Sequence, residues 1–435
     1  MKPYRWTTAA NEVTMSQSSH LPRFIAASGM TNLADGIAVV VWAWIASLLS
    51  RDPLLIALMP IALRLPWFLF ALPAGVVTDR VDRRRLILGM DVLRAVAFAM
   101  AAILVWAAIP LAPAPDNGTS DPTLFYALLT CALLVGTAEV FRDNAAQTML
   151  PALVPHEELE KANGRLWSVE LVGNSLLGPA LGAFLIAAVL WAPFSMNAVM
   201  FVLAALLILT LPGNFRPTRT TQSSVRADLV EGLVFLRAAP FLQVLAVITG
   251  VWNLLHQMVV IALVLHVQEN LGIGAQGYGL ILAAGAVGGI AGGLVADRVV
   301  KAMGQNKAAQ WMTLASAVAF AVIPFAPNGY ALALVLALFE FTGLIWNTVS
   351  VSYRQRFIPD ALLGRVNSIY RLLAWGMMPL GLLLSGLIVT AVEGVLPRTF
   401  ALMSPFVAAA AGAALLTLCA WRPLERGFQP LRQPK

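Results

Sequence analysis

The stretch Gly75-Val76-Val77-Thr78-Asp79-Arg80 ends one apolar segment, and Gly293-Leu294-Val295-Ala296-Asp297-Arg298 ends another, 218 residues further along the chain. A second similarity pairs Val154-Pro155 with Ile358-Pro359, and Asn163 with Asn367, at a spacing of 204 residues. Similar segments that recur in the same order at a large spacing indicate an internal duplication. The sequence therefore predicts two similar halves in parallel arrangement.

The composition places this chain in a lipid bilayer. Of its 435 residues, 59% are hydrophobic and only 12% are charged, and the mean hydropathy is +0.78. Soluble domains do not have this composition, and a hydrocarbon core of about 30 Å needs about 20 apolar residues per helix. Windows of that length predict spans near residues 22–49, 54–77, 87–109, 123–143, 162–190, 194–212, 241–266, 277–296, 308–325, 330–350, 366–391 and 399–421.

These spans predict an all-α membrane protein with twelve transmembrane helices in two pseudo-symmetric six-helix bundles. We expect a cytoplasmic leader at 1–20, a first bundle at 21–212, a linker at 213–240, a second bundle at 241–421 and a tail at 422–435. No small-residue cleavage site interrupts the first apolar stretch, so the leader is expected to stay in the mature protein. Within the linker, apolar positions at helical spacing predict an amphipathic helix that serves as a tether.

The basic residues fall almost entirely on one side of the predicted spans. The opposite side carries only Arg51 and Arg398. Lys and Arg gather in cytoplasmic loops of membrane proteins, so both termini are predicted to be cytoplasmic, in the inner (plasma) membrane. Because these charges are spread over one membrane face, we expect no nucleic-acid partner. They are Arg80, Arg83, Arg84, Arg85, Arg142, Lys161, Arg165, Arg216, Arg219, Arg226, Arg237, Arg298, Lys301, Lys307, Arg354, Arg356 and Arg365.

Neither metal nor cofactor chemistry is expected. Cys131 and Cys419 both lie within predicted helices and read as small core residues. The chain has four histidines, of which only His256 and His266 lie in predicted spans. No constellation of metal ligands or Ser/His pairs emerges, so the sequence argues against a membrane-embedded enzyme.

Two motifs resemble signatures of a known family. Gly75-x-x-x-Asp79-Arg80-x-Asp82-Arg83-Arg84 resembles the loop 2–3 signature of the major facilitator superfamily, and Gly173-x-x-x-x-Gly178-Pro179-x-x-Gly182 resembles its antiporter motif. Asp82 replaces the usual Gly of the first motif, and Ala183 replaces a frequent second Gly of the other. Four runs resemble the enterobactin-exporter and macrolide-efflux branch: Leu33-Ala34-Asp35-Gly36, Leu72-Pro73-Ala74-Gly75, Leu150-Pro151-Ala152-Leu153-Val154-Pro155 and Glu158-Leu159-x-Lys161-Ala162-Asn163.

The resemblance implies a monomeric transporter that exports small amphiphilic molecules in exchange for protons by alternating access. In the family, the loop signature latches the two halves in the outward-facing state. The residues that match this latch are Gly75, Asp79, Arg80 and Arg83, with Glu139 as the acidic partner and Asp297 and Arg298 as counterparts in the second half. The same arginines also serve as topology anchors.

Ionisable residues at membrane depth are costly, so each must have a partner, a wet cavity or a proton to exchange. Asp35 and Arg64 both lie roughly 20 Å above the cytoplasmic ends of their helices at 1.5 Å per residue. We therefore predict an Asp35–Arg64 ion pair, in which Asp35 exchanges a proton and Arg64 stabilises its ionised form. The alternative is a static pair that fixes the first helix against the second.

Glu340 on the tenth predicted helix also lies near mid-depth, with no obvious basic neighbour on its own helix. It is predicted to carry a proton, or alternatively to anchor helices as a neutral, hydrogen-bonded acid. Asn253 occupies the position that the 218-residue spacing matches to Asp35, and His256 and Gln257 follow one turn later. These three are predicted to line a polar cavity.

Small residues on two helices predict close packing. Gly173, Gly178 and Gly182 leave a groove on the fifth helix, and Pro179 permits a bend there. We predict that this helix packs against the eighth helix to form the moving seam between the halves. The glycines of the eighth helix are Gly285, Gly288, Gly289, Gly292 and Gly293.

The substrate is predicted from the aromatic residues. Tryptophans within spans could line a cavity for large amphiphiles, although they are more often interfacial or packing residues. The candidates are Trp42, Trp67, Trp252 and Trp346. Two other interpretations stay open: a lipid or lysophospholipid flippase, and a membrane sensor that transports nothing.

Overall fold

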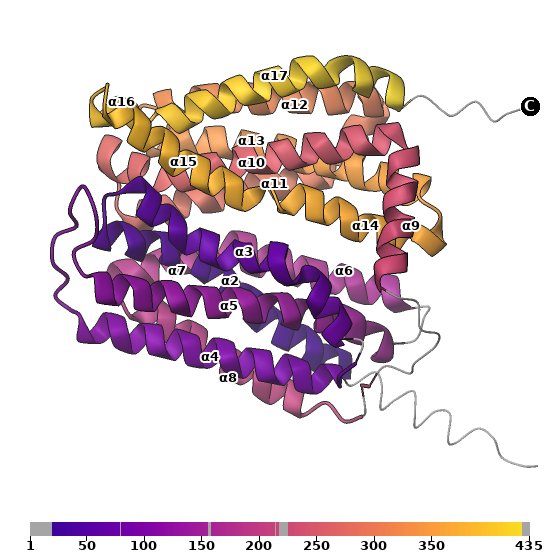
Figure 1. The fold of residues 1–435 in the computed structure, drawn as a ribbon, viewed down its shortest axis with the longest axis horizontal. Helices are drawn as coiled ribbons and strands as arrows, with labels where there is room; N and C mark the ends of the chain where they lie inside the picture. The colour runs from indigo at the N-terminus through magenta and orange to yellow at the C-terminus, as the bar shows by residue number, and fades with distance from the viewer. Residues whose placement is uncertain (1–19, 79, 155–157, 214, 217–224, 429–435) are drawn as a thin grey trace, which may run out of the picture. The chain divides into compact units, whose positions relative to one another are not determined.

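The computed structural model describes residues 20–428, apart from 79, 155–157, 214 and 217–224. Within these ranges every regular element is helical, and twelve helical segments are long and apolar enough to cross a bilayer. The predicted all-α membrane class is therefore confirmed (Figure 1). Residues 1–19 of the predicted leader, the opening of the linker at 217–224 and the end of the tail at 429–435 lie outside the described residues.

Within the described residues, the first six spans and the turn after the fourth contain seven α-helices, one π-helical segment and one 3₁₀ turn. Their bounds are α2 His20–Leu49, α3 Pro53–Thr78, α4 Arg83–Ala107, α5 Pro122–Met149 with η1 Leu150–Ala152, α6 Leu159–Glu170 with η3 Leu171–Leu177 and α7 Gly178–Ala188, and α8 Ala192–Leu209.

A linker helix and the last six spans follow. Their bounds are α9 Val225–Ala238, α10 Pro240–Leu265 with η4 His266–Asn270, α11 Ala275–Met303, α12 Gln305–Val322 with η5 Ile323–Phe325, α13 Gly329–Phe357, α14 Asp360–Trp375 with α15 Met378–Glu393, and α16 Arg398–Ala401 with α17 Ser404–Gly427.

The helices group into two compact units. The first unit comprises Met1–Val41, Leu69–Ile109 and Tyr126–Thr220, and the second comprises Trp42–Phe68, Pro110–Phe125 and Thr221–Lys435. The second unit therefore contains the last part of α2, the first part of α3 and the loop before α5, together with every helix from α9 onward.

Each unit repeats one helix pairing. In the first unit α4 packs along α8, which are the third and sixth spans of the first half; in the second unit α12 packs along α17, which are the third and sixth spans of the second half (Figure 1). The repeated pairing agrees with the internal duplication read from the sequence.

The fifth span is interrupted at its antiporter motif. The segment Leu171–Leu177 forms a π-helix, and the α-helix resumes at Gly178 with Pro179 in its first turn. Proline has no N–H and its ring clashes with the carbonyl four residues earlier in an α-helix. A wider π turn directly before Pro179 accommodates both effects, and such turns are frequent at functional sites.

The amphipathic linker helix is present as α9, and it packs against the second unit. Buried apolar side chains of Leu236, Ala239 and Leu242 form one cluster with Val366 and Ile369 of α14. Glu231 of α9 also forms an ion pair with Arg365 of α14. Only the end of α9 at Leu236 is therefore covered by protein, because Val230, Leu233 and Val234 of the same helix are exposed.

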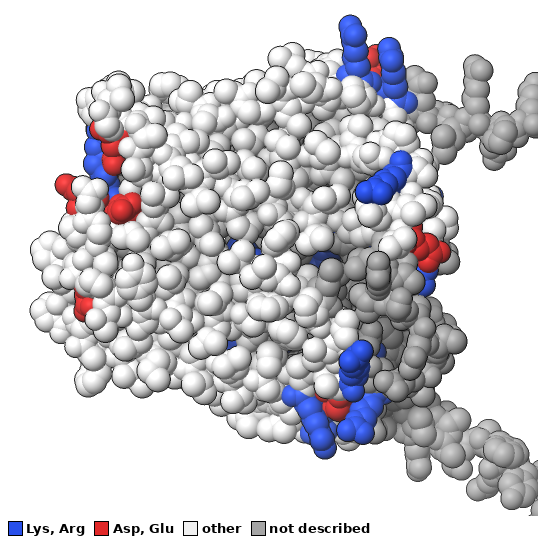
Figure 2. All heavy atoms as spheres, viewed as in Figure 1, with Lys and Arg blue, Asp and Glu red and all other residues white. Residues whose placement is uncertain are grey.

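Charged side chains lie mainly at the ends of the helices. Figure 2 shows Lys, Arg, Asp and Glu gathered there, with little charge on the surface between. Exposed large apolar side chains cover the lengths of the spans instead, such as Val96, Ile103 and Leu206. This distribution suits helices that face lipid.

Candidate functional site

A cluster of charged side chains lies inside the first unit, at membrane depth. It is formed by three helices: Asp35 comes from the middle of α2, Asp91 and Arg94 from α4, and Arg142 and Asp143 from α5. At a rise of 1.5 Å per residue, Asp91 and Arg94 lie about 12 and 16 Å along α4 from its start. The surrounding residues of α4 are almost all apolar, so the cluster is enclosed by hydrocarbon and protein.

Arg94 is at the centre of this cluster. Its side chain is fully buried and forms an ion pair with Asp35. The guanidinium carbon lies 4.1 Å from the centroid of the Phe201 ring, and that ring stacks on Phe98 with centroids 5.6 Å apart. A cation held over an aromatic face and beside a carboxylate is stabilised without water. The Asp35 side chain is 17% exposed, so the ion pair is not completely buried.

Asp91 and Arg142 form a second buried pair. Nε of Arg142 lies 3.4 Å from Oδ1 of Asp91, whose side chain is fully buried, and Nη1 of Arg142 lies 3.4 Å from Oδ1 of Asp143. Among the described residues neither carboxylate oxygen of Asp91 accepts a hydrogen bond. A buried carboxylate held by Coulomb attraction alone is poorly stabilised when ionised.

The cluster contains more acids than bases. Three carboxylates form ion pairs with two arginines: Asp35 pairs with Arg94, and both Asp91 and Asp143 pair with Arg142. With all five groups ionised, these side chains carry one net negative charge, and a net charge is strongly unfavourable where the dielectric constant is low. Uptake of a proton or a cationic ligand relieves that excess.

This arrangement corrects two predictions from the sequence. The ion partner of Asp35 is Arg94, whereas Arg64 was predicted, because equal depth on neighbouring helices does not fix which helix faces meet. Arg142 was counted among the basic loop residues, but it is buried inside α5. Asp91 and Arg94 were missed, although two opposite charges three residues apart in the apolar stretch 87–109 are a readable signal.

A second polar site lies in the second unit. Nε2 of His256 on α10 lies 3.0 Å from Oε1 of Glu340 on α13, and their side chains are 19% and 28% exposed. The sequence showed no basic neighbour for Glu340 on its own helix, and its partner His256 indeed lies on a different helix, α10. A charged side chain that faces lipid is costly, so the partial exposure of His256 and Glu340 indicates that these side chains face a polar environment.

Aromatic rings enclose the imidazole of His256. It stacks on Trp252 with centroids 4.9 Å apart and on Phe339 with centroids 5.5 Å apart. The Trp252 indole donates to Oγ of Ser316 at 3.2 Å. His256, Trp252 and Glu340, which were predicted separately, therefore form one site.

Other cavity candidates have packing roles. Asn253 is buried and donates to the carbonyl oxygen of Ala374 at 3.0 Å, which joins α10 to α14. Trp42 and Trp346 are buried, and Trp67 packs edge-on against Trp375 with centroids 5.6 Å apart. Gln257 is partly exposed.

The glycines of the antiporter motif pack against α2. A Cβ at Gly178 would lie 2.5 Å from Cα of Gly36, and one at Gly182 would lie 2.8 Å from the carbonyl oxygen of Ile37. Only glycine permits this approach, and Gly173 likewise faces the backbone of Leu33. The motif therefore holds the fifth span against the helix that carries Asp35.

The glycines of α11 pack against α13 within the second unit. Gly288 approaches the backbone of Ala337, Gly292 that of Phe341, and a Cβ at Gly285 would lie 3.4 Å from Cγ of Glu340. The glycines that meet a neighbouring backbone or side chain thus pack inside their own unit, and the seam between the fifth and eighth helices stays a prediction. Spacing identified the small-residue faces but could not identify their partners.

The loop signature ties helix ends together in the first unit. Asp82 caps the start of α4, since its Oδ1 accepts from the backbone N–H of Arg85 at 2.9 Å, and its Oδ2 accepts from the N–H of Phe215 at 3.1 Å. Arg83 donates to the carbonyl oxygen of Thr148 at 3.0 Å, near the end of α5. Cations at helix C-termini and anions at N-termini are stabilising.

The other residues of the predicted latch lie on different helices. Gly75 lies in α3, with open space where a Cβ would be, and Arg80 is exposed. Glu139 lies on α5 and is partly buried. Asp297 pairs with Lys301 at 2.6 Å on the surface of α11, beside the exposed Arg298. Asp79 lies outside the described residues.

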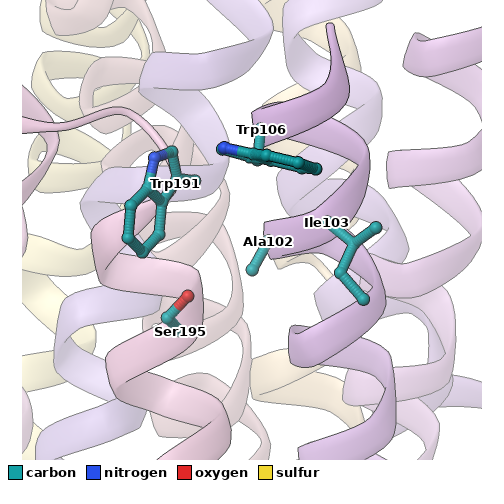
Figure 3. A pocket seen from close by; sticks show the side chains of 5 residues that line it. All are labelled: Ala102, Ile103, Trp106, Trp191 and Ser195. Carbon is teal, nitrogen blue, oxygen red and sulfur yellow. The ribbon is translucent and has the colours of Figure 1, made fainter. Parts of the chain in front are cut away.

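A shallow pocket of about 270 Å³ lies between α4 and α8, away from both polar sites. Trp106 and Trp191 face each other across it, and the hydroxyl of Ser195 points toward it (Figure 3). Ile103 and Trp106 are highly exposed. Tryptophans on such a surface are typical of the membrane interface. Among the described residues, no three His, Cys, Asp or Glu side chains are grouped to hold a metal ion.

A family profile described as transmembrane secretion effector matches residues 19–433, nearly the whole chain. The chain belongs to the major facilitator superfamily. It is therefore a multi-pass membrane transporter and not an enzyme, and the motif resemblance described above is confirmed.

Relatives of this facilitator include efflux pumps. The chain is 27% identical over 370 residues to the multidrug efflux pump Tap of Mycolicibacterium fortuitum, covering 81% of this chain and 85% of that one. It is 27% identical over 395 residues to the Tap protein of Mycobacterium tuberculosis, covering 86% and 88%. It is 24% identical over 312 residues to the enterobactin exporter EntS of Shigella boydii, covering 70% and 69%.

Solved structures agree on the fold of this facilitator. A bacterial homologue of the iron transporter ferroportin in its inward-facing state has a TM-score of 0.71 at 16% identity, covering 95% of this chain and 99% of that one. A D-xylose-proton symporter has a TM-score of 0.69 at 14% identity, covering 92% and 97%.

Proposed function

We propose that this transporter exports small amphiphilic compounds in exchange for protons, by alternating access. The names of its relatives, multidrug efflux pump and enterobactin exporter, support export of such compounds. Within this proposal the charged cluster of the first unit takes up the proton, and the His256–Glu340 site of the second unit contacts the substrate.

One observation carries the proposal: three carboxylates form ion pairs with two arginines within the first unit. Arg94 and Arg142 compensate two negative charges, and the third carboxylate favours uptake of either a proton or a cation. Asp35 is the best acceptor from solution, because its side chain keeps 17% exposure whereas that of Asp91 is fully buried. A proton on Asp35 would weaken its pair with Arg94 and so loosen α2 from α4.

The second unit offers a surface that suits an amphiphile. Trp252, which is partly exposed and stacks on the buried ring of Phe339, presents an apolar ring in the site that holds the partly exposed carboxylate of Glu340. Apolar area binds the body of the substrate, and a carboxylate beside aromatic faces favours a positively charged group. His256 holds that carboxylate when no substrate is bound.

The test is transport in proteoliposomes with an imposed pH gradient, with ethidium as a cationic amphiphilic probe. The wild-type protein should accumulate ethidium against its gradient when protons flow the other way. Asp35→Asn should abolish this gradient-driven accumulation while downhill exchange of ethidium continues. Loss of both activities in a folded Asp35→Asn protein would contradict the assignment of Asp35 as the proton acceptor.

The matched control removes a carboxylate outside the membrane. Glu231 of α9 is exposed and pairs only with Arg365 among the ion pairs described for it, so Glu231→Gln should leave driven accumulation unchanged. A fluorescent phosphatidylcholine in the same vesicles separates export from lipid flipping. Movement of the lipid without movement of ethidium would replace the proposal with a flippase.

The proposal includes an orientation and an oligomeric state. Arg83 and Arg84 bind carbonyl oxygens at the ends of α5 and α8, and we place these helix ends, and both termini, in the cytoplasm by the positive-inside rule. The protein acts as a monomer in the inner (plasma) membrane. Accessibility of a cysteine introduced at Arg80 to an impermeant reagent, in whole cells against inverted vesicles, tests the orientation.

A further inference from the structure

The second unit carries three basic side chains at the end where α12 begins and α17 finishes. Lys307 lies in the first turn of α12, and Arg422 and Arg426 lie in the last two turns of α17. All three are exposed, and Figure 2 shows Lys and Arg side chains projecting near the end of α17. Within the described part of the chain none of the three forms an ion pair. Glu425 is the only carboxylate of α17, so these three residues, which we call the basic patch, keep an excess of positive charge.

The matching helix pair of the first unit uses its basic side chain differently. There, Nη2 of Arg84 on α4 donates to the carbonyl oxygen of Leu209 at the end of α8 at 2.6 Å. In the second unit a neutral side chain makes the connection, because Nε2 of Gln310 on α12 donates to the carbonyl oxygen of Trp421 on α17 at 2.8 Å. The basic patch is therefore not needed to join α12 to α17, and its N–H groups are open to a ligand.

Two tryptophans give the depth of the basic patch in the membrane. Trp311 lies one turn after Lys307 on α12, is 49% exposed and packs edge-on against Trp421 with centroids 6.1 Å apart. Tryptophan rings prefer the level of the lipid headgroups. Counted from the Gln310–Trp421 contact, Lys307 lies about 4.5 Å and Arg422 about 1.5 Å nearer the helix ends. The headgroup zone is about 5–7 Å thick on each side of the bilayer, so both charges lie within it.

Apolar side chains continue from the basic patch toward the middle of the membrane. On each helix they share one face with the basic residue, at helical spacing. All of them are exposed: Val318 and Val322 on α12, and Leu415 and Leu418 on α17. Each helix thus presents a positive charge at headgroup depth and an apolar stripe below it, which is the order of polar and apolar parts in a phospholipid.

The start of α12 adds donors to the same place. Gly304 precedes the helix and no side chain caps it. The first N–H groups of a helix have no acceptor within the helix, and its positive end attracts anions. A cation such as Lys307 is unfavourable there by itself. A phosphate group at this point would accept from the N–H groups and compensate Lys307 at once.

We propose that the basic patch binds one anionic phospholipid of the surrounding leaflet, with the phosphate held by Lys307 and Arg422 and the acyl chains along the apolar stripes of α12 and α17. Charge selects the lipid, because a zwitterionic headgroup brings its own cation to a positive site. A second copy of this chain is a poorer occupant, since a symmetric contact would place like charges together. The site shares no residue with the charged cluster or the His256–Glu340 site and does not depend on the proposed function.

The test is native mass spectrometry of the purified full chain in detergent, titrated with dioleoyl phosphatidylglycerol or dioleoyl phosphatidylcholine. The wild-type protein should bind phosphatidylglycerol more tightly than phosphatidylcholine. Lys307→Gln/Arg422→Gln should weaken binding of the first phosphatidylglycerol molecule about thirtyfold, because each basic side chain near a membrane surface contributes about fivefold. Lys307→Arg/Arg422→Lys keeps both charges and should restore binding, which separates loss of charge from loss of the fold.

The matched control is Lys301→Gln/Arg365→Gln, which removes two basic side chains of the same unit that already pair with Asp297 and Glu231. Its affinity for phosphatidylglycerol should stay within about twofold of the wild type, as for most surface substitutions. Unchanged affinity in Lys307→Gln/Arg422→Gln overturns the site, and so does an equal loss in the control. Displacement of the lipid by excess glycerol phosphate would reduce the site to one for phosphate alone. A lipid-free dimer of the wild type would give this face to a second copy instead.

Discussion

Removing Arg94 should destabilise the first unit more than removing its partner Asp35. Arg94 is fully buried, pairs with Asp35 and lies 4.1 Å from the centroid of the Phe201 ring. Breaking a buried pair by removing one member costs about 3–5 kcal/mol, because the other charge is left unpaired. Arg94→Met preserves much of the side-chain volume, so we expect a loss of free energy of unfolding in that range.

The reverse substitution should cost less. Asp35→Leu leaves Arg94 with the electrostatic attraction of the other acidic side chains of the first unit, so we expect a smaller loss, of about 1.5–3 kcal/mol, for the hydrogen bond to a charged group. The double variant should be more stable than the sum of the single losses predicts, by about 1–3 kcal/mol. The two effects cannot be independent, because each single substitution removes the same Arg94–Asp35 ion pair.

The assay is reversible unfolding in mixed micelles with rising mole fraction of sodium dodecyl sulfate, followed by circular dichroism. Equal losses in Arg94→Met and Asp35→Leu would show that the surrounding carboxylates do not compensate Arg94. Additive losses in the double variant would show that Asp35 and Arg94 are not energetically coupled, and the account of the charged cluster would then be wrong.

Three further predictions follow from contacts described above. Gly36→Ala places a Cβ 2.5 Å from the carbonyl oxygen of Asn174 and should lower the free energy of unfolding by about 1–3 kcal/mol. Gly89→Ala lies in α4 where a Cβ meets open space, and it should raise the free energy of unfolding by up to about 1 kcal/mol. Thermal unfolding in detergent compares the two variants. Asp82→Ala removes the cap of α4 and should cost about 1 kcal/mol in the same assay, so an unchanged midpoint would contradict the capping role. Glu340→Gln should weaken binding of ethidium more than binding of an uncharged analogue, as measured by fluorescence titration, and equal effects on both ligands would remove Glu340 from the substrate site.

The fold could be predicted because each span carries its own signal. Apolar windows of about 20 residues mark helices without any knowledge of their neighbours, and the repeated Gly-x-x-x-Asp-Arg ending at 75–80 and 293–298 marks the duplication. Caps such as Asp82 are also local, since the acceptor and the N–H of Arg85 are three residues apart. These features depend on nearest neighbours along the chain.

The polar sites could be predicted only in part. Depth along a helix identified Asp35 and Glu340, because position along the axis follows from residue number. Their partners depend on helix rotation and packing: Arg94 lies 59 positions from Asp35, and His256 lies 84 positions from Glu340. The small-residue face of the fifth span was likewise readable, whereas its neighbour α2 was not.

Helix α2 runs through the boundary between the two units, since Val41 is the last residue of one segment and Trp42 the first of the next. Its 30 residues run without a break from His20 to Leu49, and Asp35 and Ser47 lie about 18 Å apart along its axis. Under the proposed function, a displacement of α2 that follows proton uptake by Asp35 would extend along this unbroken helix to the turn that holds Ser47.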